Sequence, residues 1–362
     1  VFSCAPALVT LAFPDTERGK VLGLYTMLAA IASTLGPLLG GQLVALWGWS
    51  GVLLSRVPGA SVAARLASGG IRRPGHLPPG QRFDSLGAML LTAALVGWLL
   101  VFQQGSRFGW LAFPTVLLGS VAGCCLLGFV WHTLHTAEPV LDLRFFQHLP
   151  FTLANLAHVL VNLASFTVLL LVPYYLLNVY HASALLGGAL LAMAPCGSLL
   201  AAPISGWCVS RLTARHVSLV GIGLTAVGLF GISLWPSQAN LLHITGLLAL
   251  QGFGAGLFQV ANMDFVMGTI PRHQQGVAGS LTMLTRTVGV VAGATLGSFS
   301  FALFQTSYTQ QLHAAGLGAA TLKTQVFLLA FQDVFRYAAA VALLAGLCLW
   351  SGRLSSARDV RH

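Results

Sequence analysis

The repetition of long apolar segments is the feature that most constrains the fold of this chain. Stretches rich in Leu, Val, Ala, Phe and Gly are separated by loops that carry most of the charged residues. A helix of about 20 apolar residues crosses the hydrocarbon core of a bilayer. Spans are predicted at residues 18–49, 86–104, 111–131, 152–176, 183–205, 217–235, 243–270, 277–304 and 330–350. The sequence therefore predicts an all-α, polytopic transmembrane helical bundle in contact with lipid.

Composition supports this class and excludes others. Hydrophobic residues make up 56% of the 362-residue chain and charged residues 7%, whereas soluble domains carry about 25% charged residues. The net charge is +10, but the cations are not clustered with aromatic residues, so we expect no nucleic-acid partner. The six cysteines form no C-x-x-C pair, which argues against a disulfide framework or a zinc site. No metal and no cofactor are expected.

The segment Gly51–Leu66 is a doubtful span, because Arg56, Pro58 and Arg65 interrupt its apolar residues. Loop charge nevertheless favours a crossing here. If residues 51–67 span and the loop around Arg18 is cytoplasmic, nearly all loop Lys and Arg residues fall on the cytoplasmic side, as the positive-inside rule requires. We therefore predict about ten spans plus a partial first helix. The protein is expected to be a multi-pass protein of the inner (plasma) membrane with a cytoplasmic C-terminus.

The first predicted span contains an unusual arrangement of glycines around a proline. Gly36, Pro37, Gly40 and Gly41 follow one another in the pattern G-P-x-x-G-G, with Ala32 one turn earlier. Small residues on one helix face allow a neighbouring backbone to approach closely in lipid. A proline inside a helix removes a hydrogen bond and favours a kink. Spacing alone is equally compatible with a generic packed, kinked helix.

These residues resemble the antiporter motif in the fifth helix of the major facilitator superfamily. Gly23, Gly36, Pro37, Gly40 and Gly41 match the motif, and Ala32 replaces one of its glycines. The flanking sequences FPDTERGKVLGLY, SRVPG and EPVLDLRFF are similar to the fourteen-helix drug:proton antiporter branch.

The resemblance implies a three-part organisation. Residues 1–67 would be the remainder of the N-terminal half-bundle, with the end of the fourth helix followed by the fifth and sixth helices. Residues 68–151 would be a linker with two extra helices, and residues 152–362 the six-helix C-terminal half-bundle with a cytoplasmic tail. Because SCAPALVTLAFP resembles the end of the fourth helix, we expect the chain to be an N-terminally truncated form or a fragment.

A polar helix face is predicted at the start of the C-terminal half. Asn155, His158, Asn162 and Ser165 fall within an arc of about 80° on a helix. Polar groups within a span normally face a cavity or another helix. The resemblance implies that this helix lines the transport path, so these residues are candidates for the substrate or proton path. The alternative is that His158 lies near the cytoplasmic interface, hydrogen-bonded to a neighbouring group.

A second polar face combines Gln251, Gln259 and Asn262, which are also candidates for the substrate or proton path. Asp264 lies on the opposite side of the same helix, about one turn from its end. An acid in a span is by default a functional hypothesis. At this depth, an interfacial pairing with Arg272 or with the backbone is the favoured interpretation.

Arg286 is the third polar feature, about ten residues into its span. It shares a helix face with Thr282, Gly289, Gly293 and Gly297, and a glycine stripe is typical of a packed face. Two roles remain open. Arg286 can brace a neighbouring helix, or it can couple directly to substrate or proton.

A loop motif follows the second span of this half. Gly206, Ser210, Arg211 and Arg215 resemble the family motif G-x-L-x-D-R-x-x-R. Ser210 stands where the family has an aspartate, and Arg215 falls one position late.

The resemblance implies a transmembrane transporter, with proton-coupled efflux of drugs or other lipophilic small molecules as the favoured function. Its expected partners are a small-molecule substrate and the proton as coupling ion, and we expect it to act as a monomer. Alternatives are an exporter of a small metabolite on the same fold and a non-functional transporter fragment. An intramembrane enzyme is less favoured, because no nucleophile–base pair or metal triad occurs at helical spacing. No catalytic residue is expected.

Overall fold

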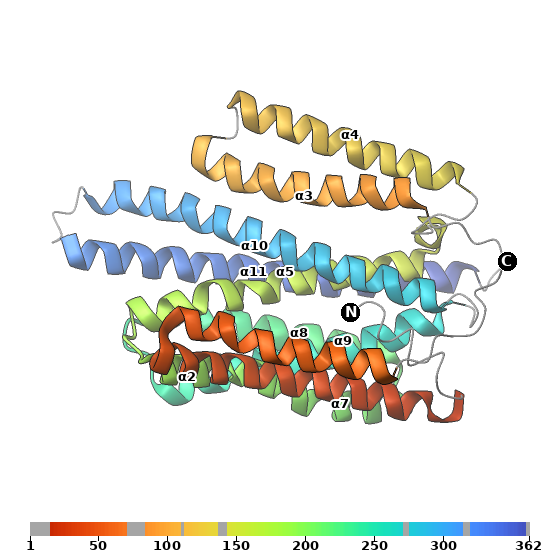
Figure 1. The fold of residues 1–362 in the computed structure, drawn as a ribbon, viewed down its shortest axis with the longest axis horizontal. Coiled ribbons are helices and arrows are strands. Elements are labelled where there is room, and N and C mark those ends of the chain that lie inside the picture. Colours follow the sequence, from red (N-terminus) through yellow and green to blue (C-terminus); the bar gives the residue numbers. More distant parts are fainter. Residues whose placement is uncertain are drawn as a thin grey trace. The chain divides into compact units, whose positions relative to one another are not determined.

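The computed structural model describes residues 15–70, 84–109, 112–136, 143–270, 275–313 and 319–359. Within these residues every regular element is a helix (Figure 1). The helices are α2 (Asp15–Gly70), α3 (Ser85–Phe108), α4 (Phe113–His135), the 3-10 helix η1 (Leu143–Gln147), α5 (Leu149–Asn178), α6 (Ala184–Leu191), α7 (Met193–Arg211), α8 (Ala214–Ile232), α9 (Leu241–Gly268), α10 (Gln275–His313) and α11 (Ala319–Asp359). The predicted all-α class is confirmed.

Seven helical segments of the described chain are long and apolar enough to cross a membrane. They are Phe113–His135, Leu149–Asn178, Ala184–Val209, Ala214–Ile232, Leu241–Gly268, Ala278–Leu312 and Thr321–Ser351. Each overlaps one of the predicted spans, and a shorter apolar helix at Ser85–Val101 overlaps another. Residues 51–67 are helical as well, but they are not among the seven segments, so their crossing stays a prediction.

The chain forms two compact units, one containing residues 144–362 together with residues 1–38, and one containing residues 39–143. The three-part division expected from the sequence rests on the family resemblance and not on contacts within the structure. It stays a prediction.

An aromatic cluster fills one end of the bundle formed by α5 to α11. Tyr175 of α5 lies with its ring centroid 5.1 Å from that of Trp235 and 5.1 Å from that of Phe331 in α11. All three side chains are fully buried. The Tyr175 hydroxyl donates a hydrogen bond of 2.7 Å to the carbonyl oxygen of Pro236, so its polar end is satisfied where the ring is buried.

Helix α9 packs between α7 and α8 through glycines. A Cβ atom added at Gly252 would collide with the carbonyl oxygen of Ala194 in α7, and one at Gly254 would collide with the backbone nitrogen of Thr225 in α8. Ser198 of α7 donates a 2.7 Å hydrogen bond to the Gly252 carbonyl oxygen. Because no hydrophobic force draws helices together in lipid, such close backbone contact is what stabilises their association.

Helices α3 and α4 run side by side in opposite directions within the other unit (Figure 1). A Cβ atom at Gly97 would lie 2.7 Å from the Cβ of Ala122, so these helices also approach at small residues. At one end, Asp84 accepts a 2.8 Å hydrogen bond from the backbone nitrogen of Gly87 and pairs with His132 of α4 at 2.8 Å. Asp84 therefore caps α3 and connects it to α4.

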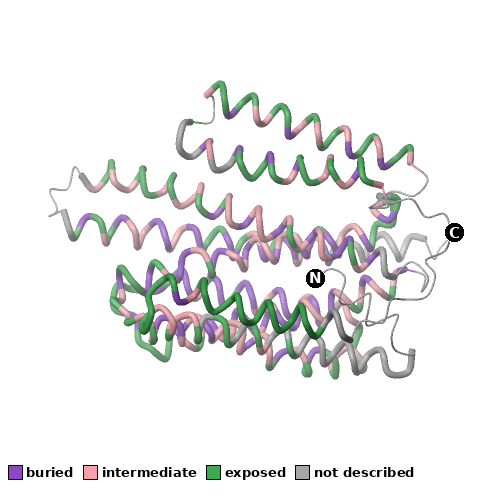
Figure 2. Tube along the Cα trace, in the orientation of Figure 1, coloured by how far each residue is buried: buried purple, intermediate pink, exposed green. Residues whose placement is uncertain are grey.

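Helix α2 is interrupted at Gly48, whose φ of 63° and ψ of −163° are not helical. Glycine adopts this left-handed backbone conformation without strain, because it has no Cβ. Figure 1 shows the chain reversing direction near this point. Helical angles continue through Pro37, where a kink was expected, and the interruption lies eleven residues later. Most described residues after Gly41 in α2 are exposed (Figure 2).

Candidate functional site

Two of the three predicted polar features meet where α5 contacts α10. Asn155 is 1% exposed. Its side-chain nitrogen donates to the Phe151 carbonyl oxygen at 3.0 Å, and its side-chain oxygen accepts a 3.0 Å hydrogen bond from the hydroxyl of Thr285 in α10. Asn155 is thus a buried polar connection between two helices, as its position on the polar face of α5 predicted.

His158 lies one turn further along α5 and is 3% exposed. Its ring centroid is 6.0 Å from that of Phe258 in α9, and it lies close to the backbone of Thr282 and to Arg286 in α10. Its Nδ1 atom has no hydrogen-bond partner among the described residues. His158 is therefore buried at the junction of α5, α9 and α10, and its side chain points into the helix bundle.

Asn262 follows Phe258 by one helical turn, so the two side chains share a face of α9. It is 1% exposed, and neither Oδ1 nor Nδ2 has a hydrogen-bond partner within the described part of the chain. An unsatisfied buried amide costs about 1–3 kcal/mol. Such a group in a native structure calls for a specific explanation, and in a membrane bundle a polar transport path provides one.

The glycine stripe on α10 brings this cluster together. A Cβ atom at Gly289 would lie 2.5 Å from the Val159 carbonyl oxygen, and one at Gly293 would lie 2.6 Å from the Leu163 carbonyl oxygen. The interpretation of this stripe as a packed face is confirmed. Arg286 lies three residues before Gly289 and is half-buried, at the edge of the α5–α10 contact.

The remaining candidates on α5 and α9 differ in their position relative to Asn155, His158 and Asn262. Asn162 donates a 2.8 Å hydrogen bond to the carbonyl oxygen of His158, and Ser165 is half-buried. Gln251 is buried against Gly228 of α8. It precedes Asn262 by eleven residues, or about 16 Å along the helix at 1.5 Å per residue. Gln259 is half-buried.

Helix α2 carries the residues that resemble the antiporter motif. Gly23, Gly36, Pro37, Gly40 and Gly41 all lie within its helical residues. A Cβ atom at Gly36 or Gly40 would have no described atom within 4 Å. The face of α2 predicted to pack is therefore open in the described part of the chain.

Asp264 is exposed, in agreement with its predicted position away from the polar face of α9. Its suggested partner Arg272 lies outside the described residues.

Sequence reasoning missed a polar group between α10 and α11. The Tyr308 hydroxyl donates to Asp333 at 2.5 Å, and Arg336 pairs with Asp333 at 2.8 Å. The signal was present in the sequence, because Asp333 and Arg336 stand three residues apart inside the predicted span 330–350 and so share a helix face.

The loop motif is part of a contact with the last helix. Arg215 donates to the carbonyl oxygens of Leu349 and Trp350 in α11 at 2.5 and 2.6 Å. Arg211 lies with its guanidinium carbon 4.3 Å from the ring centroid of Trp207. The two arginines therefore have different surroundings, although they stand only four residues apart in this chain.

A bundle of membrane-length helices with polar side chains buried at helix junctions defines a polytopic membrane protein. A family model described as Major Facilitator Superfamily matches residues 1–294 and again residues 154–355. The chain belongs to the major facilitator superfamily. It is a transmembrane protein of a transporter family and not an enzyme.

Several relatives can be compared directly. The multidrug resistance protein Stp of Mycobacterium tuberculosis is 28% identical over 81% of this chain and 54% of its own length. The tetracenomycin C resistance and export protein of Streptomyces glaucescens is 28% identical over 81% of this chain and 55% of its own length. The riboflavin transporter RibZ of Clostridioides difficile is 24% identical over 94% of this chain and 72% of its own length. The chain thus spans about half the length of the two export and resistance proteins.

A solved structure shows the same fold. A bacterial homolog of the human lysosomal transporter Spinster, in an inward-facing and unoccupied conformation, superposes with a TM-score of 0.53 at 16% identity. The superposition covers 96% of this chain and 74% of that structure.

Proposed function

We propose that the protein containing this chain is a proton-coupled exporter of drugs or other lipophilic small molecules, from the fourteen-helix antiporter branch. Two kinds of observation support this proposal. The motif at Gly23, Gly36, Pro37, Gly40 and Gly41 resembles the antiporter motif of that branch. The relatives named for multidrug resistance and for tetracenomycin C export are similar over 81% of the chain.

The substrate or proton path is proposed to run beside the cluster at the junction of α5, α9 and α10. The observation that carries this assignment is Asn262, whose buried amide has no hydrogen-bond partner among the described residues. A passing solute or a change in helix packing can supply the missing hydrogen bonds. His158 and Asn155 belong to the same junction, while Asn162, Ser165, Gln251, Gln259 and Arg286 complete the proposed set of path residues.

The proposal includes an arrangement in the membrane. The cytoplasmic membrane is the proposed location, with the C-terminus inside, because most loop cations then lie on the cytoplasmic side. Residues 1–67 and 152–362 are proposed to belong to the two half-bundles, with residues 68–151 as the linker that carries two extra helices. The protein is proposed to act as a monomer.

A second candidate function is the export of a small, polar metabolite. One relative is named as a riboflavin transporter and is similar over 94% of the chain. The buried junction also offers amide, hydroxyl and imidazole groups together with Arg286, while α5 and α10 contain no Asp or Glu. This chemistry suits a solute with hydrogen-bonding groups as well as it suits an apolar drug.

Dye accumulation in cells expressing the gene that encodes this chain tests the proposal. We expect lower accumulation of lipophilic dyes than in control cells, and recovery of accumulation when an uncoupler abolishes the proton gradient. Unchanged accumulation across a broad dye panel would favour the metabolite exporter instead.

The proposed path is tested by Asn262→Leu, which removes both polar atoms. We expect loss of extrusion at normal membrane abundance. Thr295→Val is the matched control, because among the described residues the Thr295 hydroxyl donates only to carbonyl oxygens of its own helix. Equal transport by both variants would remove Asn262 from the path.

A further inference from the structure

A carboxylate lies within the span of α11, where this helix contacts α10. The Oδ2 atom of Asp333 accepts a 2.5 Å hydrogen bond from the hydroxyl of Tyr308 in α10, and its Oδ1 atom pairs with Arg336 at 2.8 Å. An acid within a membrane span is costly and is by default a candidate for a functional role. The transport path proposed above includes none of these three residues.

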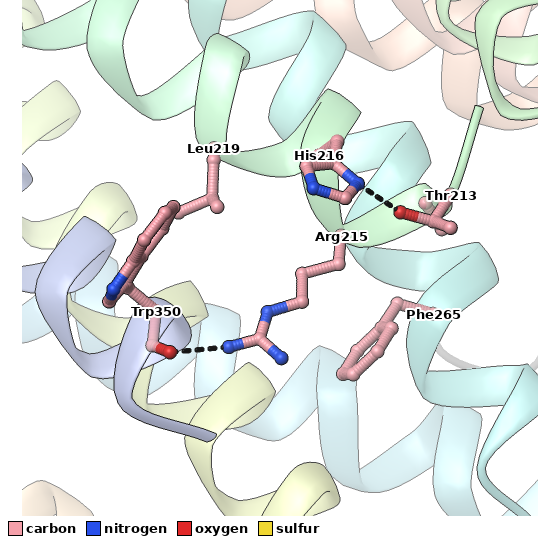
Figure 3. Close-up of a pocket in the computed structure, with 7 residues that line it drawn as sticks. Thr213, Arg215, His216, Leu219, Phe265 and Trp350 are labelled. Carbon is pink, nitrogen blue, oxygen red and sulfur yellow. Dashed lines mark hydrogen bonds between the residues drawn. The ribbon is translucent and has the colours of Figure 1, made fainter. Parts of the chain in front are cut away.

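Asp333 lies toward the end of the bundle opposite to Arg215. Along α11 it is about 26 Å from Trp350, at 1.5 Å per residue, and the Trp350 carbonyl oxygen accepts a hydrogen bond from Arg215 at the other end of the helix (Figure 3). The adjacent residue Gln332 donates to the carbonyl oxygen of Trp235, in the loop between α8 and α9. Asp333 is thus at a level where α8 has already ended. In the proposed orientation this level faces away from the cytoplasm.

The titratable groups around Asp333 are few. Tyr308 faces it from α10, and Arg336 and Tyr337 lie beside it on α11. Tyr175 of α5 instead donates its hydroxyl to a backbone carbonyl oxygen beyond α8. The described stretches of α11 and of the helices packed against it contain no other Asp, Glu, Lys, Arg or His: residues 324–352 of α11, 287–312 of α10, 159–180 of α5 and 217–232 of α8. A proton that binds between these stretches therefore finds a single carboxylate.

Protonation of Asp333 changes the contact between α10 and α11. In the ionised state the carboxylate accepts from both Tyr308 and Arg336, and such charge-assisted hydrogen bonds are about twice as strong as neutral ones. A proton from water that binds Oδ1 breaks the bond to Arg336, whose guanidinium keeps its charge and has access to water, because its side chain is 51% exposed. Oδ2 then accepts from Tyr308 as part of a neutral acid. The bond between the two helices is weaker in this state.

The same geometry favours a proton over a metal cation. Arg336 places a positive charge 2.8 Å from Oδ1, which repels a metal cation at that oxygen. Hard metal cations also require several oxygen ligands, whereas the described residues offer one carboxylate and one tyrosine hydroxyl here. A proton needs only one oxygen atom, and it can displace Arg336 without any further ligand.

We propose that Asp333 binds the coupling proton, which it takes up from the side of the membrane opposite to the loop around Arg215. This inference rests on the proposed proton-coupled transport. Helix α10 connects the two sites, since it carries Tyr308 beside Asp333 and Thr285 in the hydrogen bond to Asn155. A ligand that binds one arrangement of two helices more tightly shifts the population toward that arrangement. Proton binding at Asp333 therefore favours a position of α10 with a looser contact to α11.

Labelling with dicyclohexylcarbodiimide tests proton binding, because this reagent modifies protonated carboxyl groups in apolar surroundings. Mass spectrometry of the peptide that contains Asp333 measures the labelled fraction in membranes at a series of external pH values. We expect labelling to rise as the pH falls. Arg336→Gln should increase the labelled fraction at a given pH about fivefold, which is the strength of a partly exposed ion pair. Lys323→Gln is the matched control, since it removes an exposed charge from the same helix about 15 Å away, and it should have no effect.

Dye extrusion by cells expressing the gene that encodes this chain tests the role in transport. Asp333→Asn imitates the protonated side chain and cannot release a proton, so we expect extrusion to be lost at normal membrane abundance. Asp333→Glu keeps the carboxylate and should retain extrusion with a shifted pH profile. Tyr308→Phe removes only the contact between the helices, so extrusion should be slower but should keep its dependence on external pH.

Three results would overturn the inference and leave the proposed export function in place. The first is labelling of Asp333 that does not change with pH. The second is extrusion by Asp333→Asn with the pH profile of the unmodified protein. The third is an equal fall in melting temperature for Asp333→Asn and Tyr308→Phe with unchanged extrusion per folded molecule, because Asp333 would then only hold α10 against α11. Extrusion by the unmodified protein that is insensitive to an uncoupler would instead reject the proposed function and the inference together.

Discussion

The glycines of α9 and those of α2 have opposite surroundings. In α9, Gly252 and Gly254 lie so close to the backbones of α7 and α8 that a Cβ atom would collide with them. In α2, Gly36 and Gly40 have no described atom within 4 Å of a Cβ position. Small residues in a span therefore predict a face that permits close approach, and only the structure shows whether a neighbour occupies it.

The difference has a physical basis. Lipid tails are as apolar as leucine, so helices in a bilayer associate through close packing and hydrogen bonds rather than through hydrophobic burial. Glycine makes that packing possible but does not supply a partner. In α9 the partner is present, and Ser198 adds a hydrogen bond to the contact.

The largest expected effect is that of Gly252→Leu. The new side chain would have to displace the backbone of α7, and overpacking of this kind costs about 1–3 kcal/mol or more. We expect a severe loss of folded protein in the membrane, measured by fluorescence-detected size-exclusion chromatography. Gly40→Leu in α2 should leave abundance nearly unchanged. An equal loss in both variants would show that α2 also has a close neighbour.

The next largest effect is expected within α10, where two glycine-to-alanine changes can be compared. Gly293→Ala would press on the backbone of Leu163 in α5, whereas Gly279→Ala meets the flexible end of Met267. We expect the first change to lower the unfolding temperature, at a cost of about 1–3 kcal/mol. The second should be neutral or stabilising, because alanine favours a helix by about 1 kcal/mol over glycine. Similar melting curves for the two variants would contradict the packed stripe.

A further pair of variants tests whether Arg286 contributes to helix packing or to coupling with substrate or proton. Lysine keeps the charge but loses the planar fork of donors, so Arg286→Lys should reduce membrane abundance less than Gly293→Leu does. Abundance is measured by quantitative immunoblotting of membrane fractions. Lost transport in Arg286→Lys, with normal abundance for Gly293→Leu, would assign Arg286 to coupling rather than to packing.

Thr285→Val, which removes a hydrogen bond between α10 and α5, is expected to have a smaller effect on stability. This change leaves the side-chain oxygen of the buried Asn155 without its 3.0 Å partner, at a cost of about 1–3 kcal/mol. Thermal unfolding in detergent measures the loss, and Thr295→Val serves as the control. If both variants melt at the same temperature, the bond between the helices contributes little.

The smallest effect concerns the α3–α4 pair. Asp84→Ala removes the cap of α3 and the contact with His132, and loss of a cap typically costs about 1 kcal/mol. Asp84→Asn should retain the capping part, since asparagine caps as well as aspartate. Equal melting temperatures for Asp84→Ala and the unmodified protein would show that Asp84 does not stabilise this pair.

Much of the candidate site was predictable from helical periodicity. Asn155 and His158 were placed on one polar face of α5, and both are buried at a helix junction as a polar face in a span requires. The glycine stripe of α10 was read as a packed face. By contrast, Gln251 and Asn262 share a predicted face but occupy different depths, with Gln251 against α8. Periodicity predicts the direction in which a side chain points around the helix axis. It does not predict which neighbouring helix lies there at a given position along the axis.

The sequence by itself determined that this chain is an all-helical membrane protein, because a bilayer admits only long apolar segments whose backbone hydrogen bonds are satisfied internally. It also carried residues that resemble motifs of the family to which the chain belongs. Only the tertiary structure decided which helices are neighbours. The contact of Asn155 with Thr285 joins residues 130 positions apart, and that of Arg215 with Trp350 joins residues 135 positions apart. Such pairs depend on close packing between whole helices, and no local pattern in the chain encodes that arrangement.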